Sequence, residues 1–176
     1  MTSVRLSPVQ MADCADLIAA NHASTSYHAP WTSPFKDEEG FQSWFSQTVT
    51  GANIGLVARE SGSNGVVGVL TLSQIVLGNF RSCYLGYYGM AAFSGQGLMT
   101  QALNATLAYA FKQVGLNRVE ANIQPGNHRS IALVQRCGFE KEGFSKRYLK
   151  INGEWGDHDR WAGLAVILPA GLPIWL

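Results

Sequence analysis

The stretch that decides the fold is Ser94-Gly95-Gln96-Gly97-Leu98-Met99-Thr100, a glycine turn between two regular segments. It follows a strand-like run at residues 83–88 and opens a helical pattern at residues 102–114. The first amides of a helix have no partner within the helix, and they lie at the positive end of its dipole. Because Gly95 and Gly97 have no Cβ, a ligand can approach this backbone closely. This order of strand, glycine turn and helix therefore predicts a binding site for a phosphate or a similar anion.

Two common phosphate-binding motifs do not match this turn. The glycines between residues 86 and 97 depart from the G-x-G-x-x-G spacing of dinucleotide-binding proteins, and no acidic residue follows at the right distance on a second strand. The Gly-Lys-Ser/Thr sequence of a Walker loop is absent. The alternative interpretation of the stretch is a tight turn in which Ser94 caps the helix.

The order of elements along the chain predicts a mixed α/β protein. Helical spacing of apolar residues covers 13–21, 37–49, 102–114 and 130–136, and residues 24–35 look irregular. Strand-like runs cover 4–6, 54–59, 66–75, 81–88, 118–123, 144–151 and 154–164. Asn152-Gly153 is a strong signal for the turn of a hairpin. Because helices alternate with strands only in the second half, a doubly wound parallel sheet is not expected.

Composition favours one globular domain over residues 1–176. Apolar residues make up 47% of the 176 residues and charged residues 14%, which is typical of a chain with an adequate core. The net charge of +1 predicts neither DNA nor a membrane as partner. The first residues lack the apolar core of a signal peptide. Cys14, Cys83 and Cys137 lack metal-ligand spacing, so we expect no metal site and read them as reduced thiols of a cytoplasmic protein.

Three further motifs follow the glycine turn and carry a family resemblance. They are Asn127-His128-Arg129-Ser130, Gly138-Phe139-Glu140-Lys141-Glu142-Gly143 and Gly153-Glu154-Trp155-Gly156-Asp157-His158. In this order they resemble the GNAT acetyltransferases, and more narrowly the RimJ/RimL type, which acetylates the N-terminal amine of ribosomal proteins. The resemblance runs from about residue 65 to 164, and in the N-terminal third only Pro30-Trp31 echoes it. It implies a central, mostly antiparallel twisted sheet that is splayed at the cofactor site and flanked by about four helices.

The resemblance implies acetyl-CoA as the acetyl donor. Backbone amides of the glycine turn would hold the pyrophosphate, and the end of the preceding strand would pair with the pantetheine arm as a sheet edge pairs with a strand. The side-chain amide of Asn127 would also reach the cofactor, although Asn is equally suited to cap a helix. The cofactor-binding residues implied in this way are Tyr88, Gly89, Met90, Gly95, Gln96, Gly97, Leu98, Met99, Thr100 and Asn127.

Ser130 is the first candidate for a catalytic residue. In enzymes of the RimJ/RimL type, the serine at this place is thought to hydrogen-bond or protonate the departing thiolate of CoA. The alternative is a first-turn serine that only satisfies the helix end. Many GNAT enzymes carry a tyrosine four residues later, where this chain has Val134. RimL-type enzymes offer a glutamate where this chain has Leu149, so Glu120 is the best acidic candidate for a base, and a proton relay through Tyr87 is another route.

The missing base favours an acceptor amine of low pKa. A free α-amine has a pKa near 8 and a lysine near 10.4, so that roughly a tenth to a third of α-amines are neutral at cytosolic pH against about a thousandth of lysines. The segment 27–31 is expected to line the acceptor side, because its proline stiffens it and its aromatic rings can hold a peptide end. Packing of Trp31 on the core is the alternative. The residues expected to bind substrate are Tyr27, His28, Trp31 and Tyr87.

The sequence therefore predicts an acetyl-CoA-dependent N-acetyltransferase. Direct attack by the N-terminal α-amine of a protein, such as a ribosomal protein, is the leading hypothesis. A small-molecule or aminoacyl amine as acceptor stays open, as does a non-catalytic module that senses acetyl-CoA or docks on the ribosome. The apolar segment at residues 169–176 either docks on its own domain or supports a dimer, so that both a monomer and a homodimer are compatible with the sequence.

Overall fold

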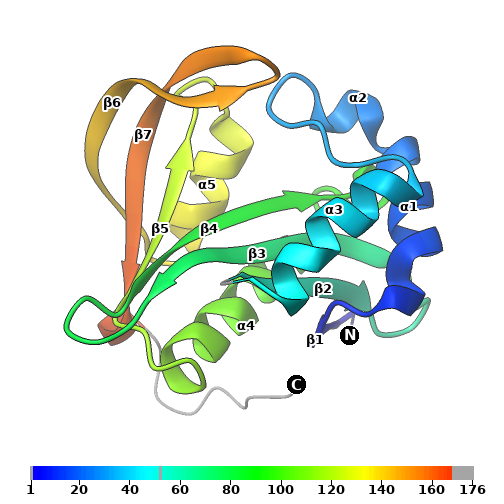
Figure 1. Cartoon of the computed structure of the whole chain (residues 1–176), viewed down its shortest axis with the longest axis horizontal. Coiled ribbons are helices and arrows are strands. Elements are labelled where there is room, and N and C mark those ends of the chain that lie inside the picture. The colour runs from blue at the N-terminus through cyan, green and yellow to red at the C-terminus, as the bar shows by residue number, and fades with distance from the viewer. Residues whose placement is uncertain (1, 52, 168–176) are drawn as a thin grey trace.

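The computed structural model describes residues 2–51 and 53–167, and it contains a single seven-stranded sheet (Figure 1). The strand order is β1-β2-β3-β4-β5-β7-β6, and every neighbouring pair is antiparallel except the parallel pair β4–β5. The strands are β1 (Val4–Pro8), β2 (Ile54–Glu60), β3 (Val66–Val76), β4 (Ser82–Gly89), β5 (Arg118–Ile123), β6 (Glu140–Ile151) and β7 (Glu154–Leu164). This confirms the expected mostly antiparallel sheet. The expectation for residues 169–176 lies outside the described residues.

Helices cover both faces of the sheet (Figure 1). Because side chains of a strand alternate between faces, Leu56 packs in the core beneath α4 and α5, whereas Val57 packs with Leu17 and Phe41 of α1 and α3. Among the described residues the α-helices are α1 (Cys14–Ala23), α2 (Thr25–His28), α3 (Glu38–Val49), α4 (Leu98–Lys112) and α5 (His128–Arg136).

Element bounds differ most from the expected ones at three places. The helix after the glycine turn starts at Leu98 rather than at 102, because Leu98 is fully buried and already belongs to the apolar face. The segment expected to be irregular contains the single turn α2. The strand expected from 144 starts at Glu140, since Glu140 and Lys141 pair with β7. The hairpin turn at Asn152-Gly153 is confirmed, and both residues have positive φ.

The strands β4 and β5 separate after three paired positions. Ser82, Cys83 and Tyr84 pair with Arg118, Val119 and Glu120, whereas β4 continues to Gly89 and β5 to Ile123 (Figure 1). We call the space between these two unpaired strand ends the β4–β5 gap. On its other edge β4 stays paired with β3 as far as Gly89. One edge of β4 is therefore free of a neighbouring strand over residues 85–89, as the sequence led us to expect.

The described residues set two further boundaries on function. Among residues 2–51 and 53–167, no helix has the length and apolar character needed to cross a membrane. The same residues contain no group of three or more His, Cys, Asp and Glu side chains placed to hold a metal ion.

Candidate active site

The N-terminus of α4 presents uncapped amides to open space. Gly97 is the N-cap residue, with φ of 75°, and no side chain accepts a hydrogen bond from the first turn. Gly95 has φ of 77°, and a Cβ built on either glycine meets no atom within 4 Å. Ser94 lies three residues before the cap, so the alternative in which Ser94 caps this helix is wrong. The geometry fits an anionic group, because unpaired amides and the helix dipole point to the same place.

Side chains beside these amides are engaged elsewhere. The Gln96 amide donates to the carbonyl oxygen of Ala92 at 3.1 Å. Leu98 is fully buried, and Met99 packs on the sheet, where a Cβ at Gly89 would lie 2.9 Å from Met99 Cγ. Of the expected cofactor residues in this turn, Gln96, Leu98 and Met99 therefore offer their main chain rather than their side chains.

The hydrogen-bonding pattern of β4 decides which backbone groups face the gap. The amide of Met90 donates to the carbonyl oxygen of Val67 at 2.9 Å, so Met90 points its main chain toward β3. In an antiparallel pair the direction alternates residue by residue. Tyr88 therefore also points its main chain toward β3, whereas Tyr87 and Gly89 point theirs toward the gap. Of the three expected residues at this strand end, Gly89 is the one whose main chain faces the gap, and Tyr87 joins it.

The side chain of Tyr87 meets Ser130 on the α5 side of the sheet. The two hydroxyl oxygens are 2.5 Å apart, and the Tyr87 hydroxyl also lies 3.3 Å from the Ser130 carbonyl oxygen. Burial raises the pKa of the Tyr87 phenol well above its usual value. The phenol therefore stays protonated near neutral pH, which suits a hydrogen-bond donor better than a base. Val134, at the position where other family members carry a tyrosine, is fully buried in the core.

Ser130 is held in place by the cap of its own helix. Asn127 is the N-cap residue of α5, and its side-chain oxygen accepts a hydrogen bond from the Ser130 amide at 3.2 Å. The capping role weighed for Asn127 from the sequence is therefore present. Its amide nitrogen is oriented by this contact, because the oxygen is the acceptor.

Glu120 lies at the root of the gap and is already paired. It sits opposite Tyr84 at the last rung between β4 and β5. Its carboxylate accepts a hydrogen bond from Arg118 Nε at 2.8 Å, and Arg118 also pairs with Glu142. One carboxylate oxygen of Glu120 is therefore already engaged by a guanidinium group. Leu149, on β6, is partly exposed and offers no acid–base chemistry.

The segment 27–31 closes the other end of β4. His28 is 4% exposed, and its Nε2 lies 2.8 Å from the carbonyl oxygen of Gly89. Because a carbonyl oxygen only accepts, the neutral imidazole carries its proton on Nε2, and the buried Nδ1 has no partner among the described residues. Burial lowers the pKa of His28, which keeps the ring neutral.

This segment also contacts the second half of the chain. Arg129 lies over the ring of Tyr27, with its Cζ 5.1 Å from the centroid. A Cβ on Gly126 would lie 3.0 Å from the indole of Trp31, and Asn152 donates to the Pro30 carbonyl oxygen at 3.1 Å. Of the four residues expected to bind substrate, His28 contacts Gly89 and Tyr87 contacts Ser130, whereas Tyr27 lies against Arg129 and Trp31 near Gly126.

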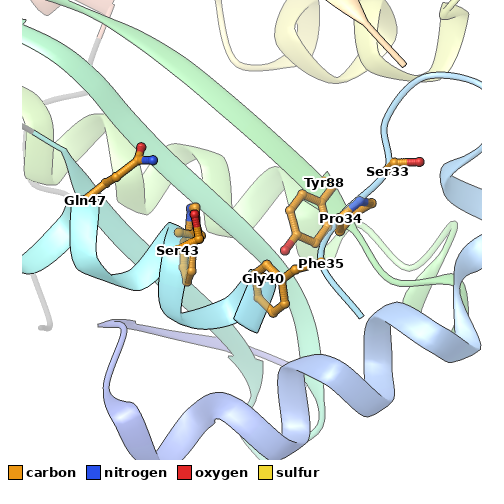
Figure 2. Close-up of a pocket in the computed structure, with 8 residues that line it drawn as sticks. Ser33, Pro34, Phe35, Gly40, Ser43, Gln47 and Tyr88 are labelled. Carbon is orange, nitrogen blue, oxygen red and sulfur yellow. The ribbon is translucent and has the colours of Figure 1, made fainter. Parts of the chain in front are cut away.

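A pocket that is open to solvent, and that the sequence did not indicate, lies between α3 and β4, and we call it the cavity (Figure 2). Its volume is about 320 Å³. The ring of Tyr88 projects from β4 toward Phe35 and Gly40, and Ser43 and Gln47 follow α3 (Figure 2). The sequence shows this segment only as a helix with regularly spaced apolar residues. Among its aromatic residues, Phe41 is buried, whereas Trp44 is half-buried and lines the cavity. The lining residues are Ser33, Pro34, Phe35, Gly40, Ser43, Trp44, Gln47 and Tyr88.

Comparisons with known proteins agree with this geometry. The model of the acetyltransferase (GNAT) domain family matches residues 3–140. The [ribosomal protein uS5]-alanine N-acetyltransferase of Escherichia coli is 45% identical over 93 residues, which are 53% of this chain and 48% of that enzyme. The chain thus spans about half the length of the curated relatives it matches.

Solved structures match nearly the whole chain. The Mycobacterium smegmatis RimJ structure in complex with CoA-disulfide is 31% identical, with a TM-score of 0.84, and the match covers 94% of this chain and 84% of that one. Spermidine N-acetyltransferase from Vibrio cholerae, in complex with CoA and spermine, has a TM-score of 0.79 over 94% of this chain and 98% of that one. At 18% identity, the second likeness concerns the fold alone.

Proposed function

Because the chain belongs to the GNAT acetyltransferase domain family, we propose that it acetylates the N-terminal α-amine of a protein, with a ribosomal protein as the leading acceptor. It is an N-acetyltransferase that uses acetyl-CoA, as the members of this family do. The relative named for uS5-alanine acetylation supports the choice of acceptor, although the match covers about half of each chain.

The residues present fit acetyl-CoA. The uncapped amides from Gly97 to Thr100, with Gly95 before them, would hold the pyrophosphate. The main-chain groups of Tyr87 and the amide of Gly89 face the β4–β5 gap and would pair with the pantetheine arm, whereas the Gly89 carbonyl oxygen already accepts a hydrogen bond from His28. Bound there, acetyl-CoA supplies the thioester carbon that the acceptor amine attacks directly, without a covalent intermediate on the enzyme.

The contact of 2.5 Å between Tyr87 and Ser130 carries the proposal. A protonated Tyr87 donates to Ser130 Oγ, which leaves the Ser130 hydroxyl proton free to point into the gap. In our proposal, Ser130 Oγ donates a hydrogen bond to the departing sulfur, and Tyr87 strengthens it by donating to Ser130 Oγ. The proton that the attacking amine loses leaves through solvent and neutralises the released thiolate. Many GNAT enzymes carry a tyrosine on the helix at the position of Val134. In this chain the tyrosine hydroxyl beside the serine belongs to Tyr87 of β4 instead.

In this proposal the acceptor amine loses its proton with little help from a base of the enzyme. Glu120 remains the candidate base, but its carboxylate is held by Arg118 and contributes weakly. A lysine costs roughly 3 kcal/mol more to deprotonate than an α-amine, and the site offers little to offset that cost. This favours a protein N-terminus over a lysine side chain or a polyamine.

Acetyl-CoA turnover, read as release of free thiol, tests this function. The acceptors are peptides that begin with Ala or Ser, the same peptides with a blocked N-terminus and an internal lysine, spermidine, and small aminoacyl amines. We expect release with the free peptides, with mass spectrometry locating the acetyl group on the α-amine. Ser130→Ala lowers the rate by about tenfold or more, whereas Ser46→Ala, on the exposed side of α3, leaves it unchanged.

Two results would overturn the proposal. Release with spermidine or a small amine, but with no peptide, would make the chain a small-molecule acetyltransferase. Binding of CoA without release on any acceptor would make it a sensing or docking module.

A further inference from the structure

Neighbouring tyrosines of β4 point to opposite faces of the sheet. The side chain of Tyr87 reaches Ser130 on the α5 side, and that of Tyr88 lines the cavity beside α3. This follows from strand alternation, in which successive side chains leave on opposite faces. The end of β4 at the β4–β5 gap therefore contacts Ser130 through the side chain of Tyr87 on one face of the sheet, and lines the cavity through the side chain of Tyr88 on the other face.

The cavity lies on the face from which an acceptor has to come. The uncapped α4 terminus and Ser130 both belong to helices on the α4–α5 face. With the donor on that face, an amine reaches the thioester carbon from the other face, where the α2–α3 loop and α3 lie. The cavity opens there, one side chain away from the main chain that borders the gap.

The lining of the cavity carries no charge. Its inner wall is formed by Pro34, Phe35, Trp44 and the ring of Tyr88, and its polar groups belong to Ser33, Ser43 and Gln47 on the exposed rim. The hydroxyl of Tyr88 is turned behind this wall toward Asn21, and burial raises its pKa to about 12, so it stays uncharged as well. A charged group that enters such a cavity loses part of its hydration, and the carboxylate beside its Gly40 wall, that of Asp37, already accepts a hydrogen bond from the Gly40 amide at 2.8 Å.

The walls of the cavity are fixed before any ligand binds. The rings of Phe35 and Trp44 lie 5.5 Å apart, and the Trp44 indole donates to Thr71 Oγ1 at 3.3 Å. Gly40 lets the α2–α3 loop pack against α3, because a Cβ there would lie 2.7 Å from Phe35 Cβ. A preformed apolar wall with a few polar groups at its rim is the usual make-up of a selective binding site.

We propose that this cavity receives the side chain of the second residue of the acceptor peptide and selects uncharged side chains. The inference rests on the proposed function. The first residue carries the reacting nitrogen and so lies at the gap, and one further residue advances a peptide by about 3.3–3.6 Å, toward the cavity. Ser, Asn, Val and Leu fit the lining, with rim hydroxyl and amide groups available to the polar ones. Lys and Glu do not fit, because the lining offers neither an acid nor a base.

A charge placed in the cavity tests the inference. The acceptors are peptides that differ only at the second position: Ala-Ser, Ala-Leu, Ala-Lys and Ala-Glu followed by a common sequence. The wild-type chain should prefer Ser and Leu over Lys and Glu by about tenfold or more in kcat/KM, mainly through KM. Ser43→Asp should shift the Lys-to-Ser ratio of kcat/KM about tenfold toward Lys and should weaken the Glu peptide further. Gln42→Asp, exposed on the side of α3 that faces away from the lining residues, is the matched control and should leave both ratios unchanged.

The outcomes separate the inference from the proposed function. If peptides are acetylated without discrimination at the second position, or if the two aspartate variants behave alike, the cavity is not the subsite and the proposed function stands. If the discrimination lies at another position and Ser43→Asp leaves it unchanged, the inference is again overturned. If no peptide reacts while spermidine or a small amine does, both fall.

Discussion

The hydroxyl of Tyr87 lies 2.5 Å from Ser130 Oγ, although the two residues are 43 positions apart in the chain. One comes from β4 and the other from the first turn of α5, and the β4–β5 gap lies beside them. Because burial raises the pKa of the phenol, Tyr87 stays protonated and can donate to Ser130 Oγ, as the proposed mechanism requires. Four predictions follow from this contact and from its surroundings.

Removing the Tyr87 hydroxyl should slow the chemical step. Tyr87→Phe keeps the ring and should lower kcat by about tenfold or more with little change in KM for acetyl-CoA. The loss in the double variant Tyr87→Phe/Ser130→Ala should stay close to that of Ser130→Ala alone, because the two groups act as one unit. Steady-state kinetics with Tyr109→Phe, on α4, as the control checks this. Multiplicative losses would show that the two hydroxyls act independently.

Gly97→Ala should weaken binding of CoA and destabilise the fold. Its φ of 75° costs an L-residue about 1 kcal/mol, and the new methyl group stands in the open space before the α4 amides. Gly78→Ala is the matched control, since Gly78 has φ of 70° with an equally open surrounding but lies in the β3–β4 turn. Both variants should lose similar thermal stability, and only Gly97→Ala should raise the calorimetric Kd for CoA. An unchanged Kd for CoA in Gly97→Ala would show that the N-terminus of α4 is not part of the cofactor site.

His28 should make the fold less stable as the pH falls. Its folded-state pKa is lowered by burial, so the unfolded chain binds the proton more readily. The free energy of unfolding therefore falls as the pH drops below the ordinary histidine value of about 6.5. Denaturant unfolding between pH 7.5 and 5.5 should show a steeper loss for the wild type than for His28→Gln, with the exposed His128→Gln as control. Parallel pH curves for wild type and His28→Gln would contradict the prediction.

Glu120→Gln should have a modest effect. With Arg118 already bound to its carboxylate, the loss in kcat/KM on an α-amine peptide should be about threefold to tenfold. Glu142→Gln, which removes the other partner of Arg118, controls for the ion pair itself. A fall of more than about a hundredfold for Glu120→Gln alone, with a changed pH profile of kcat, would make Glu120 the principal base.

Local signals were enough for most of the fold. The strand at 118–123 has the expected bounds, because its apolar side chains alternate strictly and Pro125-Gly126 follow its last buried residue, Ile123. The Asn152-Gly153 turn formed as expected, since both residues tolerate positive φ. The start of α4 was expected four residues late, because the side chains that begin its buried face, Leu98 and Met99, belong to the glycine motif as well.

The candidate site was only partly visible in the sequence. Gly95 and Gly97 could be identified from the sequence as candidate cofactor-binding residues, because a glycine turn before a helix is a local pattern. In the structure both have positive φ and open space around them. The direction of the main chain at Tyr87, Tyr88 and Gly89 depends on the register with β3, which one strand does not reveal. The cavity beside Trp44 depends on how far α3 stands from β4, so an aromatic stripe on the helix is compatible with core and with a binding surface alike.

By itself, then, the sequence determined the order of elements, the glycine turn before α4 and the family resemblance, because each of these arises from residues close together along the chain. Only the tertiary structure decided that Tyr87 completes the Ser130 hydroxyl chain, that Arg118 occupies Glu120, and that an uncharged cavity adjoins Tyr88. These are contacts between distant segments. They depend on the separation of β4 from β5 and on the packing of α3 and α5 on opposite faces of the sheet. The alternation of side chains along each strand is compatible with this packing but does not determine it.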